Sequence, residues 1–205
     1  MIRVRRRREP SRFDSLVRQP GIAFLMKCPA PTTAEWKSHA YWSNVKEELY
    51  HAFNQICCYS CHWIPQEGSR TCDHFVSKCQ SPADAYEWRN MRLAGSIVNG
   101  RKATSTHIPD PCSLPDGSFI IEFPSLLVRP GTCLKSERSL QIESAITTLG
   151  LNDESTCLAT RRSWLREYCL GRFDLDYLRG KAPFLAMELE RQNVVQRIKT
   201  MMNFR

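Results

Sequence analysis

Five polar residues in the middle of the chain have the types and the order of a site that hydrolyses phosphate esters. Asp73 and His74 are adjacent, and Asn99 is followed closely by Arg101 and Lys102. A carboxylate and an amide oxygen suit a hard divalent cation, Mg²⁺ or Mn²⁺, which keeps several waters and also binds phosphate. A neutral His74 beside that ion could take a proton from an attacking water, and the two cationic side chains could hold the flanking phosphates. Together these residues predict hydrolysis of phosphodiester bonds.

This chemistry requires elements that bring the side chains to one place. Neighbouring residues on a strand point to opposite faces of a sheet, so Asp73 and His74 can face one cleft only where their strand ends. We expect Asn99 on a short helix that follows, with Arg101 and Lys102 close to the cation. The prediction is therefore a strand end and a short helix that meet at a cleft.

The rest of the sequence predicts helices mixed with a few short strands. Trp42, Val45 and Leu49 recur at helical spacing, which predicts an amphipathic helix over 33–56. Further helices are expected at 93–103, 139–149, 155–170 and 182–202, strands within 57–75 and at 118–123 and 126–128, and loops at 77–92 and 106–117. The expected fold class is α+β.

These elements divide the chain into four parts. We expect a basic N-terminal arm at 1–20, a helical segment at 21–56, a small core at 57–103, and a β-hairpin and helical region at 104–205 for packing and partner docking. A chain of 205 residues suits one fairly large domain or one core with two small appendages, and it can bury a sizeable core without disulfide bonds.

Charge gives a further hint about partners. The net charge is +8, and seven of the first twenty residues are Arg, against only Glu9 and Asp14. Such an arm favours polyanions, namely nucleic acid or the acidic face of a partner, although a disordered, solubilising tail fits the composition equally well. The basic start lacks the apolar stretch of a secretory signal, and no apolar run could span a membrane, so a cytoplasmic protein is expected.

The ten cysteines are unevenly distributed. Five of them lie within 57–79, and the remaining five are widely spaced. The length of the chain and the lack of a secretory signal argue against a disulfide framework, and clustering in a chain expected in the cytoplasm indicates a site more than scattered core thiols. The scattered cysteines are interpreted as small buried hydrophobic residues.

Three motifs carry a resemblance to a known family. The runs Asp73-His-Phe75, Tyr86-x-Trp-x-Asn90 and Asn99-x-x-Lys102 resemble the HNH endonucleases, which have a ββα-metal fold. The similarity is specifically to the HNH subunits that accompany an ABC-type ATPase in Septu-like and retron-associated antiphage systems. The segment Arg8-Glu-Pro-Ser-Arg-Phe-Asp14 and the stretch from 146 to 162 also resemble that branch, so the likeness covers most of the chain.

The resemblance implies a role for each position of the motifs. His74 would be the general base that activates water, and Asp73 and Asn99 would bind one divalent metal ion. Asn90 would orient the His74 loop by hydrogen bonding, and Lys102 would contact phosphate. The metal would stabilise charge on the phosphate oxygens.

One departure from the family concerns zinc. Many relatives bind a structural Zn²⁺ with two Cys-x-x-Cys pairs, whereas here only Cys58 and Cys61 are present and the second pair is replaced by Gly95 and Val98. One pair is half of a tetrahedral site. Structural Zn²⁺ is therefore not expected, and the thiols are interpreted as packed in a small core.

We therefore expect a small ββα-metal HNH core embedded in flanking α-helices. The implied function is a metal-dependent HNH endonuclease that cuts nucleic acid, DNA or RNA, as the effector of an antiphage defence complex. The implied partners are an ABC-type ATPase and the reverse transcriptase and non-coding RNA of a retron, with docking through the basic arm and the helix at 182–202. The alternative is a non-catalytic nucleic-acid-binding subunit of such a complex.

Overall fold

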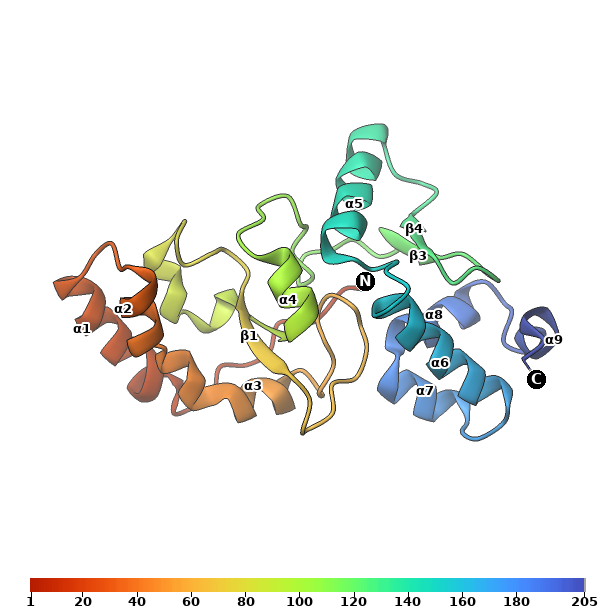
Figure 1. The fold of residues 1–205 in the computed structure, drawn as a ribbon, viewed down its shortest axis with the longest axis horizontal. Coiled ribbons are helices and arrows are strands. Elements are labelled where there is room, and N and C mark those ends of the chain that lie inside the picture. The colour runs from red at the N-terminus through yellow and green to blue at the C-terminus, as the bar shows by residue number, and fades with distance from the viewer. Residues whose placement is uncertain (205) are drawn as a thin grey trace.

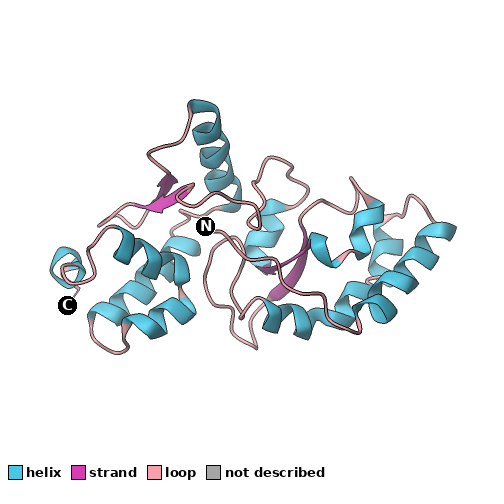
Figure 2. Cartoon of the chain, turned by 180° about the vertical axis from the view of Figure 1, so that it is seen from behind, coloured by secondary structure: helices cyan, strands magenta, loops and turns pink. Residues whose placement is uncertain are grey.

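The computed structural model describes residues 1–204, and its architecture is α+β, with helices around two separate sheets of two antiparallel strands each. The molecule is elongated: the N-terminal helices form one end, the first sheet and a short helix form the middle, and the last helices form the other end (Figure 1). Figure 2 shows the same arrangement from behind. Within the described residues, every helix is too short or too polar to span a membrane.

The N-terminal end consists of short helices joined by turns. They are a π-helical turn (Asp14–Arg18), α1 (Gln19–Lys27), α2 (Thr33–Ser38), a 3₁₀ turn (Tyr41–Val45) and α3 (Lys46–Ala52). The single helix predicted for 33–56 is wrong, because the chain turns after α2. The ring of His39 stacks on Phe24 at that turn, with ring centroids 3.8 Å apart. The helical spacing persists across the break because the residues on both sides of the turn bury their apolar side chains in one core.

The central part is a β-hairpin-like pair followed at once by a helix. Strand β1 (Arg70–His74) pairs with antiparallel β2 (Met91–Gly95), so that Asp73 lies opposite Arg92 and His74 opposite Met91. Helix α4 (Ser96–Lys102) packs against both strands. The helix predicted over 93–103 is correct from 96 onward, whereas its first residues belong to β2.

The first ten residues are extended and packed against the protein. The Met1 side chain is 1 % exposed. The Val4 N–H donates to the Pro111 carbonyl over 2.8 Å, and the Arg7 carbonyl accepts from the Trp88 indole over 2.9 Å. The basic segment is therefore not a disordered tail, and its apolar residues belong to the core.

The remaining part contains the second sheet and the last helices. Strand β3 (Phe119–Ile121) lies within the strand predicted at 118–123, whereas β4 (Val128–Pro130) begins two residues later than the strand predicted at 126–128, because Leu126, with φ of 63°, belongs to the turn. The helices are α5 (Ser136–Leu149), α6 (Cys157–Cys169), α7 (Leu175–Lys181), α8 (Pro183–Arg191) and α9 (Ile198–Met202). Helix α5 ends at Gly150, which has a left-handed φ of 63° that favours glycine. The helix predicted over 182–202 is interrupted near Asn193, where φ is 52°.

Candidate functional site

A cavity of about 290 Å³ lies beside the end of β1 and the outer part of α4. Asp73, His74 and Asn99 all line it. Two of these residues come from the end of a strand and the third from the following helix, as the sequence predicted. The other lining residues are Cys72, Ser77, Lys78, Cys79, Ala103 and Thr104. We call this the Asp73 cavity.

His74 is held in one orientation at this cavity. Its Nε2 lies 2.9 Å from the Ala85 carbonyl oxygen, and its ring makes an edge contact with Trp42. A carbonyl oxygen only accepts hydrogen bonds, so Nε2 carries the proton and Nδ1 is left as the basic nitrogen. Burial, together with the nearby charge of Lys78, lowers the pKa of His74 to about 4. The ring is therefore neutral near pH 7 and able to accept a proton.

Asn90 fixes the loops on both sides of His74. Its Oδ1 accepts from the Val76 N–H over 2.7 Å, and its Nδ2 donates to the carbonyls of Val76 and Asp84 over 2.9 and 3.0 Å. Val76 follows His74 closely, and Asp84 precedes the Ala85 carbonyl that binds the imidazole. This placement suits the orienting role that was expected of Asn90.

Asp73 is a buried carboxylate, 4 % exposed, with one protein donor on each oxygen. Its Oδ1 accepts from the Lys102 ammonium over 3.0 Å, and its Oδ2 accepts from the Tyr59 hydroxyl. Burial and the adjacent Asp73 raise the pKa of the Tyr59 phenol well above its ordinary value, so the hydroxyl stays protonated and donates. Tyr59 was not singled out from the sequence, because nothing in its local pattern distinguishes it from a core tyrosine.

Lys102 does not fit the phosphate contact expected from the sequence. Its side chain is 1 % exposed. Besides Asp73, its ammonium donates to the carbonyls of His74 and Phe75 over 3.0 and 3.2 Å, which uses all three of its donors. Lys102 therefore holds Asp73 and the backbone after β1 in place.

Arg101 also differs from its expected role. Its guanidinium pairs with Asp153 over 2.8 Å and points to the Gly150 carbonyl. These contacts connect α4 with the turn after α5. Arg101 is therefore engaged in packing, away from the residues that line the Asp73 cavity.

Lys78 is the cationic side chain that does line the Asp73 cavity. It lies near the Trp42 ring, with Nζ 5.5 Å from the ring centroid, and it makes no ion pair within residues 1–204. Lys78 was not among the residues predicted from the sequence. The available signal was a basic residue four positions after the histidine.

The oxygens of Asp73 and Asn99 fit a hard divalent cation. A carboxylate has about four acceptor positions, and two of those on Asp73 are occupied by Tyr59 and Lys102. Asn99 uses its Nδ2 to donate to the Thr71 hydroxyl over 3.0 Å, while its Oδ1 accepts from no described residue. Two protein oxygens with room for water are what Mg²⁺ or Mn²⁺ commonly uses.

Cys58 and Cys61 are both buried, and burial raises the pKa of each thiol. Within residues 1–204, no group of three or more Cys, His, Asp or Glu side chains is arranged to hold a metal ion. Both thiols lie in the hydrophobic core.

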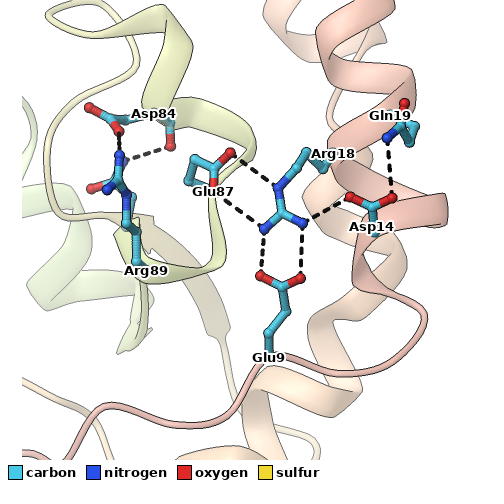
Figure 3. Close-up of polar contacts among 8 residues, drawn as sticks. Glu9, Asp14, Arg18, Gln19, Asp84, Glu87 and Arg89 are labelled. Atoms are coloured by element: carbon cyan, nitrogen blue, oxygen red, sulfur yellow. Dashed lines mark hydrogen bonds and ion pairs between the residues drawn. The ribbon is translucent and has the colours of Figure 1, made fainter.

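The loop that carries the Ala85 carbonyl is also held from the opposite side. The Arg18 guanidinium binds Glu9, Asp14 and Glu87 together (Figure 3). Its Nε donates to Glu87 over 3.1 Å, and one terminal nitrogen donates to Glu9 over 2.9 Å. This ion-pair network joins the extended N-terminal segment to the loop behind His74.

No protein-family model matches the chain, and a comparison with curated proteins finds no similar sequence. The residues that line the Asp73 cavity, and the motifs to which they belong, are therefore the basis for assigning a function.

Proposed function

We propose that the protein is a metal-dependent endonuclease of the HNH type that hydrolyses phosphodiester bonds in nucleic acid. The observation that carries the proposal is the meeting of Asp73, His74 and Asn99 at one cavity of a strand–strand–helix unit. A base, a carboxylate and an amide oxygen in that arrangement are the groups such a reaction needs.

His74 would act as the general base. The Ala85 carbonyl keeps the proton on Nε2 and thereby leaves Nδ1 to accept a proton from the attacking water. Asn90 supports this geometry because it binds the backbone at Val76 and Asp84. Positioning of this kind determines whether the basic nitrogen is in reach of the water.

Asp73 and Asn99 would hold the Mg²⁺ or Mn²⁺ ion, which, when bound, stabilises negative charge on the phosphate. Lys78 would contact a phosphate oxygen, since it is the cationic side chain at the cavity. Lys102 and Tyr59 would fix the Asp73 carboxylate. This assignment replaces the phosphate roles first expected for Arg101 and Lys102.

A non-catalytic nucleic-acid-binding subunit remains the second candidate, and one observation favours it. Both oxygens of Asp73 already have protein donors, and the Lys102 ammonium compensates its charge. Asp73 could then be a structural residue, and the basic surface would bind nucleic acid without cutting it.

The role in an antiphage complex, with an ABC-type ATPase and a retron reverse transcriptase and non-coding RNA as partners, rests on the resemblance of the motifs. The proposed docking segments need revision. The apolar residues of α8, Phe184, Leu185 and Leu189, are buried in the core, and the first residues of the arm are packed as well. Deletion of either segment would therefore remove part of the core, and loss of partner binding by such a variant would reflect misfolding.

The experiment compares the wild type with His74→Ala on DNA and RNA in the presence of Mg²⁺ or Mn²⁺. Loss of a general base should lower the cleavage rate about 10²–10⁴-fold while nucleic-acid binding is retained. His51→Ala is the matched control, because His51 is exposed on α3 and away from the cavity. Equal cleavage by wild type and His74→Ala would remove the proposal, and binding without any cleavage by the wild type, with or without an ATPase partner, would favour the second candidate.

A further inference from the structure

The arginines of the N-terminal segment differ in their partners. Arg18 is neutralised by Glu9, Asp14 and Glu87, and is therefore structural. Arg3 and Arg5 are exposed and make no ion pair within residues 1–204. Uncompensated arginines on an ordered segment require an explanation, because the positive charges repel one another across a short distance.

The extended backbone explains which arginines face the solvent. Ile2 and Val4 pack against the hydrophobic core, and the Val4 N–H is fixed to the Pro111 carbonyl. Alternate residues of an extended chain point to opposite sides, so Arg3 and Arg5 are turned outward. Because the core holds the backbone of this segment, the two side chains extend from fixed Cα positions.

Three exposed arginines of this segment line a broad hollow. Arg3, Arg5 and Arg6 line a cavity of about 700 Å³ together with Cys112 and Asp116. Asp116 is the one carboxylate among these lining residues, so the three arginines outweigh it. Arg6 lies 3.6 Å from Asp110, a carboxylate that also pairs with Arg92 over 2.8 Å. The hollow therefore carries a net positive charge.

A second hollow extends this surface toward the candidate active site. Arg6 also lines a cavity of about 300 Å³ that reaches Phe75, Val76 and Asn90, and Phe75 and Val76 directly follow His74. Its other lining residues are two ion pairs, Arg89 with Asp84 and Arg92 with Asp110. Arg6 therefore connects the N-terminal hollow with the loop that follows the proposed base.

We propose that Arg3, Arg5 and Arg6 form a binding track for the phosphate backbone of the nucleic-acid substrate. The inference rests on the proposed function, and it names how the substrate is held beside the cavity. Arginines bind phosphate oxygens through paired N–H donors without reading bases. Such contacts supply most of the affinity of sequence-independent binding.

The surface suits a polyanion better than a protein partner. Protein interfaces usually have a core of aromatic or aliphatic residues, whereas the apolar side chains of this segment, Met1, Ile2 and Val4, are packed against the protein. What the segment presents outward is charge with hydrogen-bond donors.

The test measures binding of the full chain to a fluorescent DNA duplex and to a fluorescent RNA strand over a range of salt concentrations. The His74→Ala background prevents cleavage during the measurement. Arg3→Gln combined with Arg5→Gln should weaken binding and reduce the slope of log K against log[salt] by about 1.8 on duplex DNA, which corresponds to two lost phosphate contacts at about 0.9 each. The two probes show whether DNA or RNA uses the track more.

Arg162→Gln combined with Lys135→Gln is the matched control. Both residues are exposed outside the arm, and the double variant has the same change in net charge. An equal loss in the control would show a general charge effect and overturn the proposal, as would an unchanged slope in the arm variant. Unchanged nucleic-acid affinity in the arm variant would overturn it as well. Failure of the wild-type chain to cleave, with the slope change intact, would count against the proposed function alone.

Discussion

Two carboxylates among residues 1–204 are buried beside cationic partners, Asp73 in the central part and Glu188 on α8. Glu188 is 0 % exposed and accepts four hydrogen bonds. Its donors are Arg191, which binds both oxygens, the Ile121 N–H and Gln192. Asp73 accepts only two, from Tyr59 and Lys102, and it lines a cavity. The two groups have similar burial but differ in remaining acceptor capacity.

This difference separates a structural acid from one that is able to bind a ligand. Glu188 accepts three hydrogen bonds on Oε2 and one on Oε1, about the usual total for a carboxylate, and these contacts connect α8 to β3. Asp73 keeps about half of its capacity and faces a space that also contains a basic imidazole and an amide oxygen. Burial alone therefore does not identify a functional carboxylate in this protein.

The largest expected effect comes from breaking each ion pair. Asp73→Asn alone leaves the Lys102 ammonium buried without its counter-charge, which should cost about 3–5 kcal/mol of unfolding free energy. Asp73→Asn with Lys102→Met removes both charges and should recover most of that stability, while cleavage stays lost. Chemical denaturation and a cleavage assay on the folded protein separate the two effects.

The matched change at the other carboxylate is Glu188→Gln with Arg191→Met. This double variant weakens the contact with the Ile121 N–H, which should cost about 1–3 kcal/mol of unfolding free energy. Because Glu188 and Arg191 do not line the Asp73 cavity, cleavage by the folded protein should stay unchanged. If the Asp73 and Lys102 double variant cleaved at the wild-type rate, Asp73 would be a structural residue like Glu188, and the proposed difference between the two carboxylates would be wrong.

A smaller effect is expected from Asn99→Ala, which removes an oxygen from the cavity but no buried charge. The Mg²⁺ or Mn²⁺ concentration for half-maximal cleavage should rise by about 10–100-fold or more. Loss of a residue that only hydrogen-bonds a metal ligand already has an effect of this size, and Asn99 is proposed as a ligand itself. Titration of each metal checks this result. Thermal unfolding should change little because Asn99 is only partly buried, and an unchanged metal requirement would remove Asn99 as a ligand.

The smallest effect compares one donor at each carboxylate. Tyr59→Phe removes the hydroxyl on Asp73, and Gln192→Leu removes one of four donors on Glu188. Each should cost about 0.5–1.5 kcal/mol of stability. Only Tyr59→Phe should also change the metal requirement, because it alters the orientation of a proposed ligand. The same shift in both variants would indicate a general loss of rigidity instead.

The sequence predicted the parts of the site more completely than their roles. The end of β1 at His74, the helix that carries Asn99 and the contacts of Asn90 all follow from local pattern and motif. The prediction for Lys102 did not consider which face of the helix this residue occupies. Val98 and Lys102 are four residues apart and therefore share one face of α4, and both are buried. That spacing predicts Lys102 on the packed face and away from substrate.

Two parts of the fold could not be predicted from local sequence patterns. Strand β2 contains Met91, Arg92 and Leu93, which favour helices in isolation, and its pairing with β1 overrides that preference. The N-terminal segment has the charge of a disordered tail, whereas its apolar residues alternate with arginine and pack on the core. Both outcomes depend on contacts between residues far apart in the chain, which composition and periodicity do not contain.

The hydrogen bond from Trp88 to the Arg7 carbonyl, and the ion pair between Arg18 and Glu87, have a consequence for synthesis of the protein. They join residues 81 and 69 positions apart. Ribosomes release the N-terminal segment long before the loop at 84–90 exists, and contacts of such long range form late in folding. The support behind the histidine is therefore completed only after that loop has emerged, so a nascent chain carries its arginines well before it has a finished site.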